Sequence, residues 1–369
     1  MYDENYDKMV DNWKKIISYG PKPLGSKALK ECSGYLLEEM QKITKVAYQD
    51  CYEITAWEVD KWELEVVEPN QRIIKSYLFL GSGASESFEG RVKFAGHNRI
   101  WNMYIWDRYM VVNIKGGILA YISVRKGGDA VPQMLFTGDS EIPHFIVGDE
   151  EAEFFQKASD SNTVIKGYAL TRKIPNSKCI NVVGTMEKKK KKVVICAHYD
   201  TVYATAGAYD NAAGSAVLLE IGRRLKDYEK NAEIELLLTD GEEYDLVGSR
   251  KRSKTCEGED IAMVLNIDGV GREKVLEVWC GPEPFERKVR SYMEESGGDF
   301  EVLYKCPPPP GSDHAPYYDK GIPVCMLTFN DQGILHSPKD VYTESMLDNM
   351  GIMVGLSLNL LEFLNVIKK

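Results

Sequence analysis

The chain has 369 residues, of which 44% are hydrophobic and 28% are charged, and its formal net charge is -10. A chain of this length is expected to form more than one unit, and its composition is that of a folded globular protein rather than a disordered or membrane-spanning one. The acidic balance argues against a nucleic-acid partner, because binding to a phosphate backbone depends on a surplus of lysine and arginine. We therefore expect a peptide substrate and neither nucleic acid nor membrane as partner, while the oligomeric state stays open.

The N-terminal stretch MYDENYDKMVDNWKK is acidic and amphipathic, and the chain contains no long apolar run. A signal peptide would instead be basic and then apolar, so we expect a cytoplasmic protein. The eight cysteines are scattered without a CxxC pair, which predicts reduced thiols in structural positions. Any transition metal would then be bound by histidines and carboxylates rather than by thiolates.

In chain order, residues 1 to about 50 predict two helices separated by the turn-forming stretch GPKPLGS. Short apolar runs punctuated by glycine, asparagine and proline follow, and they predict a β-rich unit over 61–165. From Asn181 onward, buried strands alternate with loops and helices, which predicts an α/β fold whose central sheet has helices on both faces, in three layers. The expected organisation is a discontinuous α/β domain, 1–60 and 166–369, interrupted by the insert.

His198 directly follows the strand-like run VVICA, at the end of a predicted strand, where α/β sheets present ligands to a crevice. Asp200 lies two residues later and would accept the other ring N–H of a metal-bound histidine, which fixes the orientation of the ring. Taken alone, this pair is equally well explained as a structural histidine with a hydrogen-bond partner.

The other candidate carboxylates precede a helix or follow the next two predicted strands. Asp210 comes before the helix AVLLEIGRRL and would either cap that helix or bridge two cations. Glu242 and Glu243 follow the run IELLLTD, and two adjacent glutamates there are either a solvated helix start or a pair compensated by metal. In the second case Glu243 binds a cation while Glu242 takes a proton from the attacking water as general base.

Asp268 ends the run MVLNID, where the alternative is a turn aspartate before Gly269, and His336 lies in the loop sequence ILHSPKD. The joint pattern is two histidines and three carboxylates, nearly all at strand ends. Because all the structural alternatives would have to hold together, the pattern favours a two-metal site. Nitrogen and oxygen ligands without thiolate are typical of zinc, with manganese or cobalt as possible substitutes.

Six ordered blocks carry a family resemblance: AHYDT, GAYDNAAGSA, DGEEYDLVGS, NIDGVG, GSDHAPYYDKGIPV and LHSPKD. With them the sequence resembles the M28 family of zinc peptidases, which includes aminopeptidases, glutamate carboxypeptidase-like enzymes and glutaminyl cyclases. The resemblance covers about 1–60 and 170–369. It implies a mixed eight-stranded sheet flanked by helices, and an enzyme with two zinc ions that removes N-terminal residues from peptides.

The resemblance also implies a role for each site residue. Asp210 would bridge two zinc ions, with Glu243 and His336 on one and His198 and Asp268 on the other. Glu242 would be the general base and Asp200 would support His198. The residues expected beside the substrate pocket, or alternatively as a hydrogen-bonded brace, are Ser312, Asp313 and His314.

Residues 61–165 are similar to a protease-associated domain, most clearly in IPHFIVGDEEAEFFQKA. Such an insert would shape or cover the substrate cleft, or else be passive, and we expect its histidines His97 and His144 to be non-catalytic. One departure from the family pattern is Pro307–Pro310, which fills the place where some members carry an oxyanion-stabilising tyrosine. The tyrosines that could replace it are Tyr304, Tyr317, Tyr318 and Tyr342.

Three alternatives to an aminopeptidase remain. A carboxypeptidase or dipeptidase would need an arginine in the pocket to bind a substrate carboxylate, and Arg250, Arg252 and Arg272 are the candidates. A glutaminyl cyclase-like transferase would use a single zinc. A non-catalytic binding module would be expected to have lost ligands, whereas this sequence keeps the full set.

Overall fold

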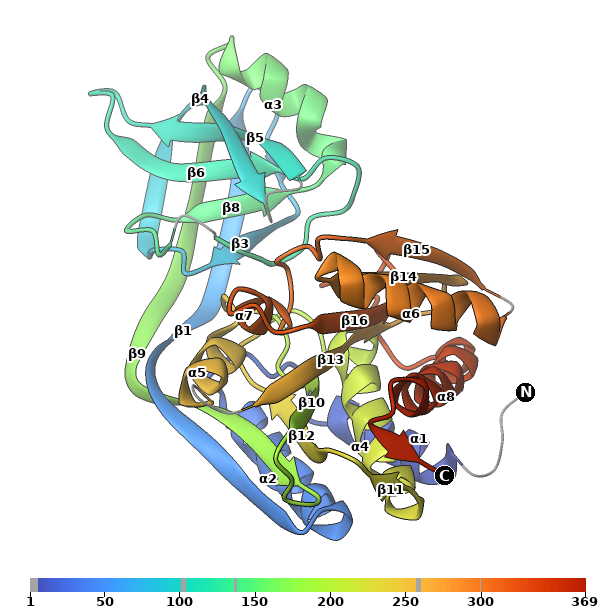
Figure 1. The fold of residues 1–369 in the computed structure, drawn as a ribbon. Coiled ribbons are helices and arrows are strands. Elements are labelled where there is room, and N and C mark those ends of the chain that lie inside the picture. The colour runs from blue at the N-terminus through green and yellow to red at the C-terminus, as the bar shows by residue number, and fades with distance from the viewer. Residues whose placement is uncertain (1–5, 101–103, 136–137, 257–259, 299) are drawn as a thin grey trace. The chain divides into compact units, whose positions relative to one another are not determined.

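Figure 1 shows the computed structural model of the chain, which describes residues 6–100, 104–135, 138–256, 260–298 and 300–369. Contacts divide the chain into two units. Unit 1 consists of Met1–Glu53, Lys178–Thr201 and Thr205–Lys369, and unit 2 consists of Ile54–Ser177 and Val202–Ala204.

These boundaries lie outside the predicted insert 61–165, because two long strands continue past its ends. They are β1, Val46–Glu68, and β9, Val164–Thr185. Along β9, exposed and half-buried residues give way to the buried run Cys179–Gly184 just after the boundary at Ser177, whereas β1 has no comparable run at Glu53.

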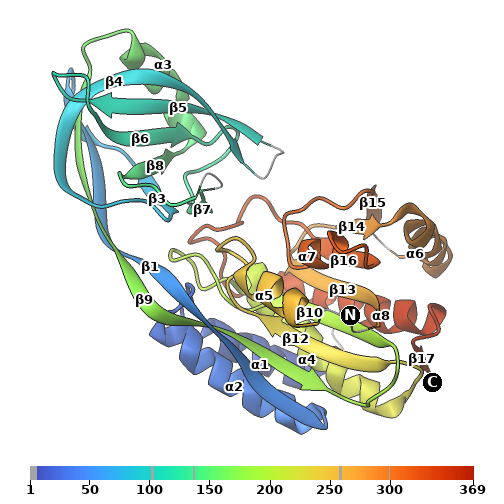
Figure 2. The ribbon, with the colours of Figure 1, turned by 60° about the vertical axis from the view of Figure 1, so that its left-hand side comes forward.

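Unit 1 is built on a mixed sheet whose strands follow the order β15-β14-β16-β13-β10-β12-β9, with β1 paired to β9 (Figure 2). Neighbouring strands are parallel from β12 through β10 and β13 to β16. β9 runs antiparallel to β12, β14 runs antiparallel to β16, and the edge strand β15 is parallel to β14. The strands not yet bounded are β10 Lys192–His198, β12 Glu233–Thr239, β13 Ile261–Val270, β14 Val275–Gly281, β15 Glu301–Lys305 and β16 Val324–Phe329. Every residue of β10, β12 and β16 is buried, as expected for parallel strands covered on both faces.

Helices cover both faces of this sheet. One face packs against α1 (Asp7–Ile17), α2 (Lys27–Ile43), α4 (Gly214–Arg224), α6 (Glu283–Ser296) and α8 (Leu347–Phe363) in a single apolar core. The other face packs around Tyr317 of the short helix α7 (Ala315–Tyr318), beside α5 (Val247–Thr255). The predicted mixed sheet flanked by helices is confirmed. None of the described helices is both long and apolar enough to cross a membrane.

The first two helices illustrate how local sequence sets the boundaries. Ser26, the last residue of GPKPLGS, caps α2 by accepting a hydrogen bond from the backbone N–H of Leu29. The remaining short elements of unit 1 are β11 Glu229–Lys230 paired with β17 Ile367–Lys368, the helical turns Leu225–Asp227 and Glu344–Met346, and the distorted segment Ala208–Ala213.

Unit 2 is the predicted β-rich insert. Its strands follow the order β9-β4-β5-β6-β8-β3-β7, with β2 paired to β1. Their bounds are β2 Arg72–Ile73, β3 Ser76–Leu80, β4 Ser85–Ile100, β5 Tyr104–Val112, β6 Ile118–Val124, β7 Gln133–Met134 and β8 His144–Val147, followed by the turn Asp149–Glu151 and α3 Ala152–Ser159. Its similarity to a protease-associated domain stays a prediction.

An aromatic cluster in unit 2 includes the three-residue segment 202–204. The ring of Tyr203 lies 5.7 Å from that of Trp57, 5.5 Å from that of Trp62 and 6.4 Å from that of Tyr77, measured between centroids. Its hydroxyl accepts a hydrogen bond from the backbone N–H of Leu78 and donates one to the carbonyl of the same residue. Tyr203 is thus held in unit 2 both by its ring contacts and by the two hydrogen bonds of its hydroxyl.

His144 is buried in unit 2 in the neutral form. The orientation of Asn98 is fixed because its Oδ1 accepts from Arg108, so its Nδ2 donates to Nε2 of His144 at 3.2 Å. Ser123 Oγ lies 2.9 Å from the same nitrogen. Burial, together with the charge of Arg108, lowers the pKa of His144 to about 3.

This buried histidine should make the protein sensitive to acid. Below about pH 6.5, His144 binds a proton in the unfolded chain but stays neutral in the folded protein. The free energy of unfolding therefore falls by roughly 1.4 kcal/mol per pH unit down to about pH 3. Urea unfolding followed by circular dichroism at pH 7 and pH 5 should show a smaller loss in His144→Gln than in the wild type. His97→Gln, at a half-exposed position, is the control that should keep the wild-type loss. Equal losses in wild type and His144→Gln would contradict the assignment.

Candidate metal centre

The predicted ligands meet at the carboxyl edge of the parallel strands of unit 1. His198 is the last residue of β10, Asp268 lies near the end of β13, and Glu243 follows the end of β12. Asp210 lies in the distorted segment before α4, and His336 lies in the loop after β16. This edge is where open α/β sheets bind their ligands.

The carboxylate of Asp210 faces two histidines with its two oxygens. Its Oδ1 lies 3.0 Å from Nε2 of His198, and its Oδ2 lies 3.3 Å from Nε2 of His336. One carboxylate therefore belongs to two clusters, as required of a ligand that bridges two cations.

Each histidine also faces a second carboxylate. Asp268 Oδ1 lies 3.1 Å from Nε2 of His198, and Glu243 Oε2 lies 2.9 Å from Nε2 of His336. The structure thus brings the predicted ligands into two groups: His198, Asp210 and Asp268, and Asp210, Glu243 and His336. Ligand atoms at about 2.0–2.1 Å from a tetrahedral zinc are roughly 3.3 Å apart, close to these separations.

The chemistry of the two groups fits a cation better than a proton. Nε2 of each histidine points at two carboxylate oxygens, and a single N–H cannot donate well to both. Oε1 of Glu243 is buried and has no hydrogen-bond partner in the described part of the chain. Burial and the neighbouring Asp210 raise the pKa of Glu243 to about 7, although His336 opposes this rise. Imidazole and carboxylate donors in this arrangement suit zinc.

Asp200 contacts both the ring of His198 and the backbone of Glu242 and Glu243. Nδ1 of His198 lies 3.2 Å from the carbonyl oxygen of Asp200 and 3.5 Å from its Oδ1, which leaves Nε2 facing the other ligands. The same carboxylate accepts the backbone N–H groups of Glu242 and Glu243, each at 3.2 Å. Asp200 is fully buried, so these bonds are shielded from water.

Glu242 is buried among the ligands but belongs to neither group. Burial is the main cause that raises the pKa of Glu242 well above its ordinary value, and the charges of Asp268 and Glu243 add to it while His198 opposes it. The turn before it depends on Gly241, whose φ of +73° lies in the region that favours glycine. A carboxylate placed here is suited to hold a proton between two steps of a reaction.

Of the residues predicted beside the pocket, Ser312 contacts a ligand directly. Its Oγ donates a hydrogen bond to Oδ2 of Asp268 and accepts one from Nδ2 of Asn266 at 2.7 Å. Asp313 accepts a hydrogen bond from the hydroxyl of Thr239. His314 donates from Nε2 to the carbonyl of Pro309 at 2.9 Å, and burial lowers its pKa to about 4. The bonds of Asp313 and His314 are those of a brace.

Two further residues hold the ligand segments and were missed in the sequence. The carboxylate of Asp340 accepts the backbone N–H groups of Tyr209 at 2.6 Å and Asp210 at 3.1 Å. Asn211 donates from Nδ2 to the carbonyl of Ile267 at 2.9 Å. A single aspartate in a loop and an asparagine beside a ligand carry no spacing signal, although Asp340 stands at the end of the block LHSPKD.

The four candidate tyrosines have different surroundings. Tyr317 of α7 is fully buried in the apolar cluster on that face of the sheet, and the ring of Tyr342 lies 4.7 Å from that of Trp13. The guanidinium of Arg290 lies over the ring of Tyr304 at 3.8 Å, and Tyr318 packs near Gly281. These contacts do not single out an oxyanion-stabilising residue.

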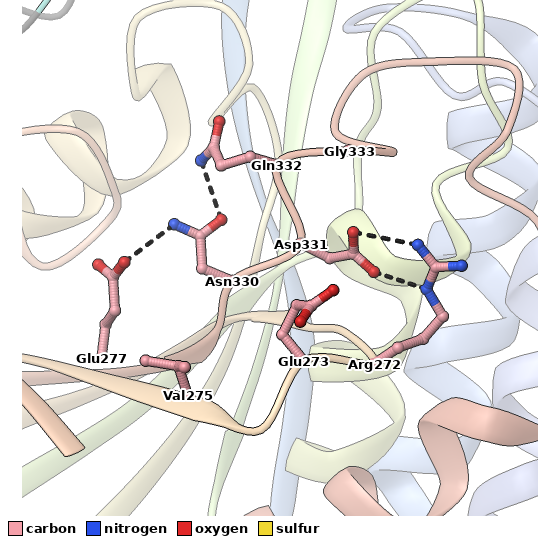
Figure 3. Close-up of a pocket in the computed structure, with 8 residues that line it drawn as sticks. All are labelled: Arg272, Glu273, Val275, Glu277, Asn330, Asp331, Gln332 and Gly333. Carbon is pink, nitrogen blue, oxygen red and sulfur yellow. Dashed lines mark hydrogen bonds and ion pairs between the residues drawn. The ribbon is translucent and has the colours of Figure 1, made fainter. Parts of the chain in front are cut away.

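A pocket of about 390 Å³ opens where β16 leads into the loop that carries His336 (Figure 3). Most of the residues that line it have polar or charged side chains; the full set is Arg272, Glu273, Val275, Glu277, Asn330, Asp331, Gln332 and Gly333. Figure 3 shows Arg272 paired with Asp331, and Asn330 bonded to Glu277. The hydroxyl of Tyr209, the neighbour of Asp210, accepts a hydrogen bond from the backbone N–H of Asp331 at 3.1 Å, which ties the pocket wall to the ligand segment.

Comparison with known proteins places this centre in a family context. Residues 181–361 match the model described as Peptidase family M28, so the resemblance is confirmed over that range. The chain is 25% identical to Aminopeptidase YwaD of Bacillus subtilis (strain 168) over 219 residues, 54% of this chain and 46% of that protein. It is 28% identical over 135 residues to the alkaline phosphatase isozyme conversion protein of Escherichia coli (strain K12), 30% of this chain and 39% of that protein. The match therefore spans less than half of either curated relative.

Solved structures share the fold. BSAP, a zinc aminopeptidase from Bacillus subtilis, has a TM-score of 0.73 at 19% identity, covering 100% of this chain and 97% of that chain. The Peptidase M28 precursor from Shewanella amazonensis SB2B has a TM-score of 0.73 at 17% identity, covering 97% of this chain and 92% of that chain. At these identities the similarity establishes the architecture.

Loss of Asp200 should weaken metal binding without removing a ligand. In Asp200→Ala, His198 keeps the backbone carbonyl beside its Nδ1 but loses the nearby carboxylate, and the N–H groups of Glu242 and Glu243 lose their acceptor. Zinc affinity should therefore fall about 10- to 100-fold. Competition with a chromogenic chelator measures this change. Asp245→Ala, at a half-exposed position paired with Arg250, should retain wild-type affinity. Unchanged affinity in Asp200→Ala would show that the ligands do not depend on it.

Proposed function

We propose that this chain, whose residues 181–361 belong to peptidase family M28, is a zinc-dependent aminopeptidase that removes N-terminal residues from peptides. The observation that carries the proposal is the shared carboxylate of Asp210, whose two oxygens face the two histidine groups. A two-zinc count follows from this arrangement, with manganese or cobalt as substitutes. A peptide substrate and the cytoplasmic location stay predictions.

An aminopeptidase is favoured over a carboxypeptidase by the surroundings of the arginines. A carboxypeptidase would need a guanidinium available for the terminal carboxylate of the substrate. Arg252 is buried and bonded to Glu235, with distances of 3.0 and 2.6 Å. Arg272 is paired with Asp331 at 2.7 Å, and Arg250 with Asp245 at 3.1 Å. Each of the three candidates is thus already engaged by a carboxylate of the chain.

The charge of the centre favours a substrate with a free α-amine. Buried carboxylates outnumber the buried cations around the two ligand groups: Asp200, Asp210, Asp240, Glu242, Glu243, Asp313 and Asp340 are all buried, against Lys22. An α-ammonium group is attracted there, whereas a terminal carboxylate is repelled. The complete ligand set also supports a hydrolase over a single-zinc cyclase or a binding module that has lost its ligands.

In the proposed mechanism the protein supplies both orientation and proton transfer. Zinc ions bound to the two groups would lower the pKa of a water molecule and polarise the scissile carbonyl. Glu242 removes a proton from the attacking water and delivers it to the leaving amine. Asp200 holds the backbone of Glu242 and the ring of His198, while Ser312 fixes Asp268 by its hydrogen bond.

Removal of the proposed base should abolish hydrolysis but not metal binding. In Glu242→Gln we expect kcat for an aminoacyl anilide to fall about 10²- to 10⁴-fold, the usual contribution of general acid–base catalysis. Zinc content by mass spectrometry should stay at the wild-type value, because Glu242 belongs to neither ligand group. Glu283→Gln, at an exposed position of α6, is the matched control that should retain full activity. Full hydrolysis by Glu242→Gln would refute the assignment.

Substrates with and without a free α-amine distinguish an aminopeptidase from a carboxypeptidase. Dipeptides and aminoacyl anilides with a free α-amine should be hydrolysed, and their N-acetylated forms should have a kcat/KM lower by on the order of 10²-fold, because the acetyl group removes the ammonium charge. Adding back zinc after chelation should restore hydrolysis of the free-amine series. Preferred cleavage of N-blocked dipeptides would identify a carboxypeptidase instead.

A further inference from the structure

We propose that Asp340 is a positioning residue that fixes the shared ligand Asp210 and thereby sets the affinity of both metal positions at once. This inference rests on the proposed two-metal function. It assigns Asp340 no contact with substrate or metal, since its carboxylate binds backbone N–H groups.

The carboxylate of Asp340 binds two consecutive N–H groups with separate oxygens. Oδ1 accepts from Tyr209 at 2.6 Å, and Oδ2 accepts from Asp210 at 3.1 Å. Two successive backbone N–H groups that converge on one anion form a nest, which fixes the backbone on both sides of the ligand. Asp340 is fully buried, so water does not compete for these bonds.

The backbone at this ligand cannot use helical hydrogen bonds. Asp210 has φ -117° and ψ 92°, and Asn211 has φ -136° and ψ 42°, although α4 begins soon afterwards. The N–H of Asp210 is therefore turned away from the helical pattern and needs a partner from elsewhere in the chain. Asp340 is that partner, and without it the backbone that carries the Asp210 side chain would lose the acceptor of its N–H group.

Asp340 also connects two ligands of one group. It lies four residues after His336, and its own N–H donates to the carbonyl of Ser337 at 3.0 Å, so the loop between them is short and folded. The hydroxyl of Thr205 donates to the carbonyl of Asp340 at 3.3 Å. The loop of His336 and the segment of Asp210 are thus joined directly, independently of any metal.

A separate bond keeps the segment folded when Asp340 is changed. Nε1 of Trp13 donates to the carbonyl of Ala208 at 2.7 Å, which belongs to the same peptide unit as the N–H of Tyr209. This peptide unit is therefore held at both ends. We expect variants of Asp340 to fold, with Asp210 free to reorient.

The test compares zinc affinity in Asp340→Ala, Asp340→Asn and a matched control. Asn349→Ala is matched because Asn349 is also buried and also makes two bonds to the main chain, to the carbonyls of Gly271 and Glu273, but none to a ligand segment. Both zinc affinities are measured by chelator competition, and cobalt-substituted protein gives an absorption spectrum that reports ligand geometry. Circular dichroism checks folding.

We expect Asp340→Ala to lower both affinities at least tenfold, the effect typical of lost outer-shell support, and to shift the cobalt spectrum. Asp340→Asn, which keeps one acceptor oxygen, should lie between Asp340→Ala and wild type, and Asn349→Ala should match wild type. If wild type binds two zinc ions and Asp340→Ala binds them with the same affinities, this inference is wrong while the proposed function stands. The same holds if Asn349→Ala loses as much zinc affinity as Asp340→Ala. A wild-type chain without zinc affinity would overturn the proposed function and this inference with it.

Discussion

The main constraint on unit 1 is the burial of several carboxylates close to one another, which the surrounding structure has to compensate. Asp210, Glu243 and Asp268 converge on two imidazoles at the carboxyl edge of the sheet, with Glu242 and Asp200 beside them. Charges of one sign at such distances raise each other's pKa and cost desolvation free energy. The structure meets this cost with backbone N–H groups, with hydroxyl donors and with ligand geometry suited to divalent cations.

Backbone groups carry much of that compensation. Asp200 accepts two consecutive N–H groups from Glu242 and Glu243, and Asp340 accepts two from Tyr209 and Asp210. In both cases a buried carboxylate outside the two candidate ligand groups holds the main chain of a residue that belongs to one of them. The ligands are therefore oriented by their backbone as well as by the cations they would bind, which reduces the reorganisation needed when metal arrives.

The sequence predicts the buried strands well because their signal is local. Runs such as VVICAH and IELLLTD are continuously apolar, as buried parallel strands require, and the candidate ligands stand at the ends of such runs. Unit 2 extends beyond the predicted insert 61–165, because the long strands β1 and β9 continue across both of its predicted limits. Asp340 was missed for a different reason: its role depends on the non-helical backbone at Asp210, about 130 residues away in the chain. The catalytic roles themselves stay predictions.

The short segment Val202–Ala204 limits how the insert could have been gained or exchanged during evolution. These residues lie between His198 and Asp210 in the sequence, yet they belong to unit 2, where the ring of Tyr203 packs against Trp57 and Trp62. A recombination event that replaced only residues 54–177 would leave that ring without its aromatic neighbours and its hydroxyl without Leu78. Residues 54–177 therefore could not be exchanged alone without loss of packing in unit 2, because Val202–Ala204, between the candidate ligands His198 and Asp210, also belong to it.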